Sequence, residues 1–241
     1  MIIQDYGLIR DYDHYFRVMY NQWEVGIDRV NNRELASSLG YHPSTISINL
    51  QKIAGMEIEG KPLLYTKKYY GTQLTPFGLS IAFSIEQKYR RFEFLLAKLG
   101  FEFYEIAHEL EKNKFTDNLI ESMFNRSRNG KPHEPLYCPH GAIIRSEIPN
   151  RRFLYSMDQV TSGHSYEFVK FDEFLFSTIT NKKEQRSLSK NLHKLQLKPS
   201  HTVVYTRKDH DEVTLENLTT SKRISLSAEV IKSIYVADQV N

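Results

Sequence analysis

Residues 31–55 read NNRELASSLGYHPSTISINLQKIAG, a stretch that predicts two short helices joined by a tight corner. Asn31 stands three residues before Glu34, which is the spacing of a capping box at a helix start. Gly40 supplies the left-handed residue that commonly ends a helix, and Pro43 suits the first turn of a second helix. Two helices around a glycine-containing corner are typical of a helix-turn-helix, whose second helix is the recognition helix.

The second helix has a clear division between an inner and an outer face. Ile46, Leu50 and Ile53 recur at helical spacing and are expected to face inward. The residues left outside are short hydrogen-bonding side chains, namely Ser44, Thr45, Ser47 and Asn49. Amphipathic helix pairs with a glycine corner also occur in other helical proteins, so the next segment matters for the interpretation.

A β-hairpin with a basic and aromatic tip is predicted over residues 63–74. Its tip is formed by Lys67, Lys68, Tyr69 and Tyr70. A lysine pair at such a tip suits phosphate contacts that fix the register of a protein on DNA. The two tyrosines are equally compatible with packing inside the protein. A hairpin after a helix-turn-helix is a wing, and the chain is expected to bind duplex DNA.

Size, charge and cysteine content narrow the class further. At 241 residues the chain is long enough for roughly two or three domains. No segment approaches the roughly 18 uninterrupted apolar residues of a membrane span, and the start lacks the order of a signal peptide. The one cysteine, Cys138, forbids an internal disulfide and fits a reducing cytoplasm. The formal charge of +3 is too small to argue for nucleic acid by itself.

The overall pattern predicts a mainly α protein with small β parts in three domains. Residues 1–75 would be a winged helix-turn-helix DNA-binding domain. Residues 76–150 contain two largely apolar helical patterns, too apolar for one helical hairpin to bury, which suggests a helical dimerisation domain. Residues 151–241 alternate short strands with tight turns and predict a small SH3-like β-barrel.

This order of parts resembles the metal-dependent repressors related to the diphtheria toxin repressor and the manganese transport regulators. The resemblance covers roughly residues 12 to 237. Its most specific parts are the recognition region, the junction Leu74-Thr75-Pro76-Phe77-Gly78 and the motif Cys138-Pro139-His140-Gly141. The last segment resembles the barrel shared with the ferrous iron transport accessory protein. The resemblance implies a cytoplasmic, homodimeric transcription regulator, most simply a repressor, whose partner is double-stranded DNA.

By this resemblance, the recognition helix lies in the major groove. The residues nearest the bases would be His42, Ser44, Thr45, Ser47, Ile48 and Asn49. Relatives often carry Gln or Glu where this chain has Ile48, which can touch a thymine methyl group but cannot hydrogen-bond. A·T-rich operators are therefore expected. The phosphate-contact candidates are Lys52, Lys67 and Lys68, with Tyr69 beside them at the hairpin tip.

The family uses a divalent metal corepressor, and its ligand pattern is poorly kept in this chain. The positions where the pattern places ligands but this chain has other residues are Tyr89, Lys112, Phe115 and Thr116. A register one residue earlier places Ala107, Glu111, Lys114 and Phe115 on the second helix. An ammonium group there repels a divalent cation. We expect that no metal is required, and that an ion pair from Lys112 to Glu93 or Asp13 does the bridging instead.

Three alternatives stay open. A metal-responsive repressor could use Mn²⁺ or Fe²⁺ at a rebuilt site of His14, Glu93 and His108. A redox sensor could use Cys138, because a neighbouring imidazolium lowers a thiol pKa, and a cavity near Tyr89 and Phe115 could accept a small ligand. A pure protein-interaction module would not bind DNA. The chain has no phosphate-binding glycine loop, His-Glu-x-x-His motif or nucleophile elbow, so we do not expect an enzyme.

Overall fold

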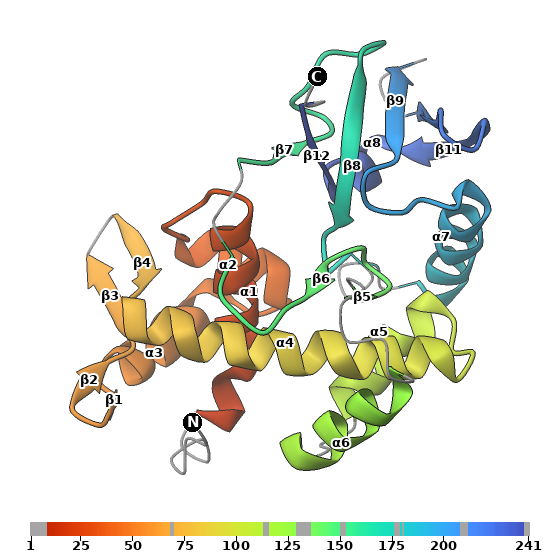
Figure 1. The fold of residues 1–241 in the computed structure, drawn as a ribbon. Coiled ribbons are helices and arrows are strands. Elements are labelled where there is room, and N and C mark those ends of the chain that lie inside the picture. Colours follow the sequence, from red (N-terminus) through yellow and green to blue (C-terminus); the bar gives the residue numbers. More distant parts are fainter. Residues whose placement is uncertain are drawn as a thin grey trace. The chain divides into compact units, whose positions relative to one another are not determined.

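The computed structural model of the protein is a mixed fold of helices and antiparallel strands (Figure 1). Its described residues are 9–67, 70–112, 116–128, 136–149, 153–175, 179, 181–207 and 212–238, with only the backbone described at 107, 108, 111 and 112. The chain divides into two compact units, which we describe separately. The N-terminal unit extends to Tyr89 and includes a short stretch from Arg145, and the C-terminal unit comprises the rest.

The N-terminal unit begins with three α-helices that follow a 3-10 turn. Their bounds are α1 (Asp13–Glu24), α2 (Asn32–Leu39) and α3 (Pro43–Ala54). The predicted capping box is present, because the Asn31 side chain accepts from the backbone N–H of Glu34 at 2.9 Å and the Glu34 carboxylate accepts from the Asn31 N–H at 3.0 Å. Gly40 ends α2 with a φ of 66°. The apolar faces of α2 and α3 are buried as predicted, with Leu35, Ile46, Leu50 and Ile53 at most 2% exposed.

Two hairpins follow the helices. The first joins β1 (Glu57–Ile58) to β2 (Lys61–Pro62) and was not predicted from the sequence. Its turn places Glu59 and Gly60 at positive φ, and Glu59 is a residue type that does not announce such a turn. The second hairpin pairs β3 (Leu64–Lys67) with β4 (Gly71–Leu74), as predicted.

The second hairpin connects directly to a long helix, α4 (Pro76–Lys98). At the junction, the Thr75 hydroxyl donates to the Pro62 carbonyl and accepts from the Gly78 N–H, both at 2.8 Å. The chains are so close here that a Cβ on Gly78 would lie 2.0 Å from the Leu63 carbonyl oxygen. Gly78 is therefore the residue that lets the hairpin contact the first turn of α4.

We predict that Gly78→Ala destabilises the protein by about 1–3 kcal/mol, the usual range for forcing extra volume into a tightly packed site. Gly55→Ala is the matched control, because its Cβ would find only ordinary contacts at 3.6 Å. Urea unfolding followed by far-ultraviolet circular dichroism measures both variants. Equal unfolding midpoints for the two variants would contradict the close approach at Gly78.

The C-terminal unit contains the rest of α4, further helices and most of the sheet structure. Its other helices are α5 (Phe103–Lys112), α6 (Asp117–Ser127), α7 (Lys182–Leu195) and α8 (Ala228–Ile231). A short hairpin pairs β5 (Leu136–Tyr137) with β6 (Ile143–Ile144). None of the described helices combines the length and apolar character needed to span a membrane.

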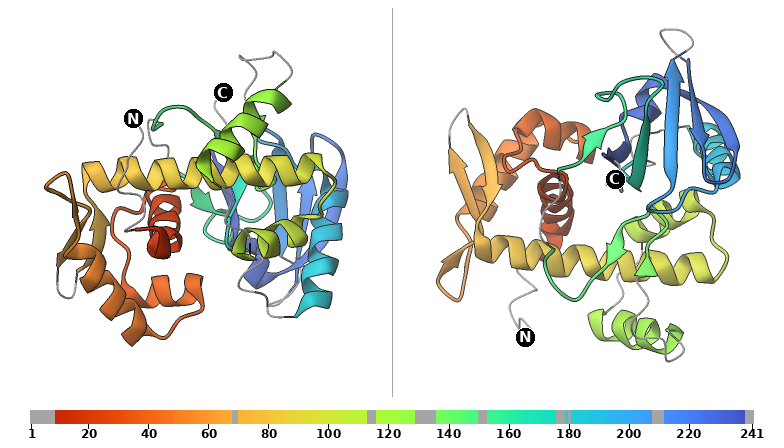
Figure 2. Two further views of the ribbon diagram at one scale, coloured as in Figure 1. Left: turned by 90° about the horizontal axis from the view of Figure 1, so that it is seen from below. Right: turned by 45° about the horizontal axis from the view of Figure 1, so that its top comes forward.

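A six-stranded antiparallel sheet organises the C-terminal unit, in the order β11-β10-β9-β8-β12-β7. The strands are β7 (Tyr155–Ser156), β8 (Ser165–Phe171), β9 (Thr202–Arg207), β10 (Glu212–Asn217), β11 (Lys222–Ser227) and β12 (Ile234–Ala237). Helix α7 packs Leu188, Leu192 and Leu195 into the apolar core beside these strands (Figure 2). The fold is thus mixed, with more sheet than the predicted mainly α protein with small β parts.

Candidate nucleic-acid interface and metal centre

Helix α3 presents an exposed face. Ser44, Thr45 and Lys52 are exposed, Ser47 is half-buried, and Ile48 is 55% exposed although it is apolar. His42 forms the N-cap of α3, where its Nδ1 lies 2.7 Å from the Ser44 hydroxyl. The described part of α3 therefore offers a row of short polar groups around one accessible aliphatic side chain.

Asn49 departs from this pattern. Its amide donates to the hydroxyl of Tyr15, on α1, at 2.8 Å, and the residue is half-buried. This bond ties α3 to α1 and holds the amide back from the exposed row. Among the residues predicted to face DNA, Asn49 thus has a structural partner within the protein.

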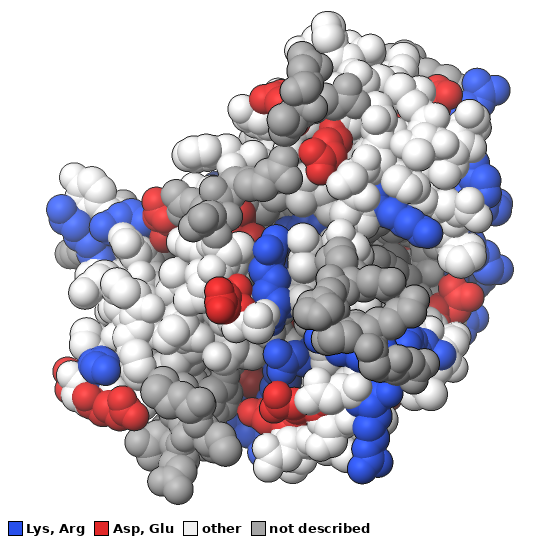
Figure 3. All heavy atoms as spheres, viewed as in Figure 1, with Lys and Arg blue, Asp and Glu red and all other residues white. Residues whose placement is uncertain are grey.

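The tip of the second hairpin carries exposed basic and aromatic side chains. Lys67 is exposed, and its Nζ lies 4.5 Å from the ring centroid of Tyr70, which is 65% exposed. Tyr70 is therefore not a buried packing residue, whereas Lys68 and Tyr69 lie outside the described residues. On the face seen in Figure 3, basic and acidic side chains are interspersed. Any attraction to DNA then depends on locally placed lysines rather than on the overall charge.

The positions of the family's ligand pattern are only partly described. His14 is half-buried between the rings of Tyr15 and Tyr41 in the N-terminal unit, and burial, with the nearby Arg17, lowers its pKa. The ring of Tyr89 lies 4.0 Å from the Arg17 guanidinium carbon. The remaining positions give little, because Thr116 is exposed before α6, Phe115 is outside the described residues, and the side chains of His108 and Lys112 are not described.

Two buried ion pairs involve α4. In the N-terminal unit, Arg17 Nε donates to the Glu86 carboxylate at 3.0 Å. In the C-terminal unit, Arg90 donates to one oxygen of Glu173 through Nη2 at 2.6 Å and Nε at 3.0 Å, and both side chains are fully buried. Sequence reasoning expected an internal ion pair but assigned it to Lys112. The pairs that the structure describes use arginines instead.

A buried cluster of ligand-type side chains lies at the same end of α4. Among the described residues, the ligand atoms of Glu93, Cys138 and His140 all lie within 4.8 Å of one another. His140 Nδ1 is 3.0 Å from Glu93 Oε2, and the buried Nε2 has no hydrogen-bond partner among the described residues. The three residues are at most 4% exposed. A carboxylate oxygen, a thiol sulfur and an imidazole nitrogen form a donor set that fits a divalent transition metal.

The β5–β6 turn brings Cys138 and His140 together. It is closed by the Cys138 N–H donating to the Ala142 carbonyl and the Gly141 N–H donating to the Cys138 carbonyl, both at 2.9 Å. Gly141 has a φ of 86° and approaches the Val169 carbonyl closely, so a side chain does not fit there. The ring of Phe103 lies 4.6 Å from that of His140 and covers it.

The thiol of Cys138 is buried, which bears on the redox interpretation. Burial, together with the carboxylates of Glu93 and Glu173, raises its pKa well above the usual value. Redox-sensing cysteines are typically accessible thiolates with a lowered pKa. The structure therefore does not favour oxidant sensing at Cys138, while a metal ion is a partner that a buried thiol beside carboxylates can accommodate.

Sequence reasoning identified Glu93 and the Cys138–Gly141 motif but did not combine them. It missed His140, Arg90 and Glu173 as functional candidates. The usable signal was the Cys-x-His spacing, since two ligand types one residue apart in a tight turn can point to one place. Nothing local indicates that Arg90 is buried or that its partner lies 83 residues further along the chain.

Comparison with known proteins gives a uniform result for the fold. No protein-family model and no curated protein sequence matches the chain. Solved structures do match over nearly the whole length. ScaR with bound Zn²⁺ has a TM-score of 0.62 at 21% identity, and a manganese-dependent transcriptional repressor in complex with manganese has 0.65 at 17%; both comparisons cover 94% of this chain and 99% of the other. The metal-dependent transcriptional regulator MtsR has 0.65 at 17%, covering 96% and 100%.

These structures correct one expectation. The prediction that no metal is required is wrong, because proteins of this fold were solved with Zn²⁺, Cd²⁺ and manganese bound and the chain itself gathers Glu93, Cys138 and His140 into a site of metal-ligand chemistry. The degenerate positions misled the prediction, because they describe one site while the cluster is assembled elsewhere. The family resemblance itself is confirmed by the structural neighbours. The chain has the fold of the metal-dependent transcriptional repressors related to the diphtheria toxin repressor.

Proposed function

We propose that the protein is a homodimeric, sequence-specific DNA-binding transcription regulator, acting as a repressor, whose activity responds to a divalent metal. The observation that carries the proposal is the exposed face of α3 beside a basic hairpin tip, in a fold shared with metal-dependent transcriptional repressors. The three functional parts would be residues 1–75 for DNA binding as a winged helix-turn-helix, 76–150 for dimerisation and 151–241 as an SH3-like domain.

The DNA-binding part would use α3 for bases and the lysines for phosphates. Exposed Ser44, Thr45 and Ile48 are the base-reading candidates, with the aliphatic Ile48 suited to a thymine methyl group. Lys52 and Lys67 are exposed and suit phosphate contacts.

Dimerisation would use apolar surface on the helices of residues 76–150. On α6, Ile120 and Phe124 are buried while Leu119 and Met123, four residues apart, are 45% and 41% exposed. Residues four apart share one side of a helix. An exposed apolar pair backed by a buried one is what a helix offers when another chain covers it.

The metal would be held by Glu93, Cys138 and His140. Carboxylate and imidazole suit manganese and ferrous iron, and the sulfur adds affinity for zinc. When bound, a divalent cation would supply the positive charge that holds these three donors together and so links α4 to the β5–β6 turn. Glu93 belongs to the helix that begins in the N-terminal unit at Pro76, so this link acts on the element that carries the DNA-binding part.

Binding to DNA tests the proposal directly. Fluorescence anisotropy with a library of double-stranded fragments, in the presence of Mn²⁺ or Zn²⁺, should select an operator whose affinity exceeds that of unrelated DNA by about 10³-fold or more. Size-exclusion chromatography with light scattering should show twice the mass of one chain. A monomer that shifts no duplex would overturn the proposal and favour a protein-interaction module.

We predict that the double variant Lys67→Ala/Lys68→Ala weakens binding to all duplexes alike. Each lost phosphate contact should reduce the slope of log affinity against log salt by about 0.9. Lys190→Ala, an exposed lysine on α7, is the control for loss of charge and should leave the slope unchanged. If the double variant kept its affinity and lost discrimination between sequences, the lysines would be base readers instead.

A further inference from the structure

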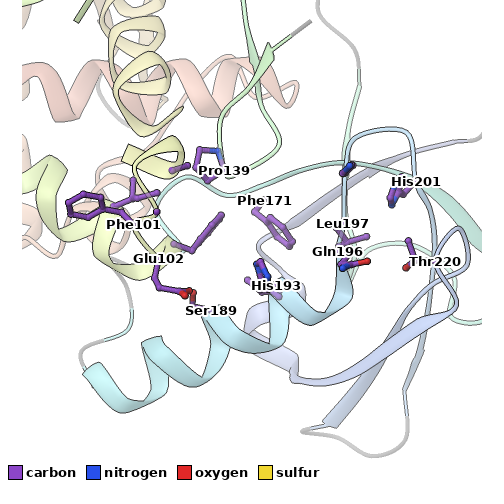
Figure 4. A pocket seen from close by; sticks show the side chains of 16 residues that line it. Phe101, Glu102, Pro139, Phe171, Ser189, His193, Gln196, Leu197, His201 and Thr220 are labelled. Atoms are coloured by element: carbon purple, nitrogen blue, oxygen red, sulfur yellow. The ribbon is translucent and has the colours of Figure 1, made fainter. Parts of the chain in front are cut away.

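A cavity in the C-terminal unit is not used by the functions proposed above. It has a volume of about 780 Å³ and lies between the end of α4, the start of α5, α7 and the turn after α7 (Figure 4). Small-molecule sites typically fall between roughly 300 and 1,000 Å³. The cavity is therefore large enough for an organic molecule of ten or so non-hydrogen atoms, which is an order-of-magnitude estimate from that range.

The walls of the cavity are mainly apolar. Phe103, Ile106, Phe171 and Leu192 contribute side chains that are buried or half-buried. One wall also includes Ser189, which is 2% exposed and whose hydroxyl has no hydrogen-bond partner among the described residues. An apolar body would be favoured here, because it removes aromatic and aliphatic surface from water.

The polar groups around the cavity are unevenly distributed. His201 lies toward one end with Gln196 and Thr220, and Glu102 lies toward the other end with Phe101 (Figure 4). Lys198 also lines the cavity and influences His201. The Asn217 amide donates to His201 Nδ1 at 3.0 Å, which leaves the proton of the neutral ring on Nε2 as a donor. One end thus combines a cation with hydrogen-bond donors, and the carboxylate of Glu102 belongs to the opposite end.

We propose that this cavity binds a small organic monoanion with an apolar body, such as an arylalkyl carboxylate. The carboxylate would lie at the end of Lys198 and His201, and the apolar body would contact Phe171 and Leu192. Glu102 repels a carboxylate at the other end and so favours this one orientation. Neutral or cationic molecules of the same shape lack the charge complementarity.

The cavity also adjoins the metal cluster. Pro139, between Cys138 and His140, lines the cavity, and Phe103 both lines it and packs on the His140 ring. An occupant would therefore contact the residues that position two of the metal ligands. Binding of the anion and of the metal would then affect each other reciprocally.

The test uses 4-phenylbutyrate, octanoate and the neutral 4-phenylbutanamide as probes of the full chain, with metal removed by a chelator and no DNA present. Ligand-observed NMR and isothermal titration calorimetry should detect both carboxylates with a Kd below 1 mM and the amide at least about fivefold more weakly, the range of an exposed ion pair. Lys198→Ala should weaken carboxylate binding by about fivefold for the same reason.

A pair of tryptophan variants locates the binding. Ala97 is exposed on α4 and lines the cavity, so Ala97→Trp should block the cavity without disturbing the core and abolish binding. Leu99→Trp is the matched control, since Leu99 is 69% exposed and does not line the cavity; it should bind as the native chain does. The proposal is overturned if neither carboxylate binds, if the amide binds as well, or if Ala97→Trp binds unchanged. None of these outcomes depends on DNA or metal binding.

Discussion

Arg90→Met is expected to destabilise the C-terminal unit by about 3–5 kcal/mol, the cost of removing one partner from a buried charge pair. Arg90 and Glu173 are fully buried, and the guanidinium approaches one carboxylate oxygen at 2.6 Å. Its loss leaves the Glu173 charge in a place with little access to water, where only Lys170, at 3.6 Å, partly compensates it. The guanidinium also donates to the Ile143 carbonyl at 3.4 Å, so the variant loses a link to β6 as well.

Urea unfolding followed by circular dichroism measures this loss, and hydrogen exchange by mass spectrometry localises it to peptides of α4 and β8. The double variant Arg90→Met/Glu173→Leu should recover much of the stability, because removing both charges leaves none buried alone. Lys232→Ala breaks an exposed pair with Glu229 and should leave the unfolding midpoint unchanged. If Arg90→Met cost no more than Lys232→Ala, the pair would contribute nothing to the fold.

The helix ends illustrate what the sequence allowed us to predict. The capping box of Asn31 and Glu34, the stop at Gly40 and the start at Pro43 depend on residues within four positions of each other. Such signals act through the local backbone, so they hold whatever surrounds them. The same is true of the alternating strand at residues 165–171, which the structure places in the six-stranded sheet.

The parts that could not be predicted depend on contacts between distant residues. An arginine on a helix normally indicates a solvated face, and only the fold reveals that Arg90 meets Glu173 in the interior. Likewise, His140 lies 47 residues from Glu93, and the β5–β6 turn alone brings them together. Fitting a family's ligand pattern along one helix could not reveal a cluster that uses a different segment of chain.

Cys138→Ser and His140→Ala are each expected to weaken binding of Zn²⁺ or Mn²⁺ by about 100-fold or more. Loss of a group that merely orients a ligand already costs 10–100-fold, and these residues would supply the donor atoms themselves. Both are nearly fully buried within 4.8 Å of Glu93, so no solvent-exposed side chain can easily take their place. Operator affinity should then become independent of metal, and EDTA should no longer release the DNA from either variant.

Chelator-competition titrations give the metal affinity, and fluorescence anisotropy with and without EDTA gives the DNA affinity. His164→Ala, an exposed histidine in the same unit, controls for loss of an imidazole and should behave as the native chain does. His14→Ala separates the two candidate sites, because a site of His14, Glu93 and His108 would lose its metal in this variant while the Glu93, Cys138 and His140 cluster would keep it. Metal binding that survives Cys138→Ser and His140→Ala but disappears in His14→Ala would place the ion at the other site. Glu93→Gln should impair both, since that carboxylate belongs to either set, and the contrast among the variants therefore rests on Cys138, His140 and His14.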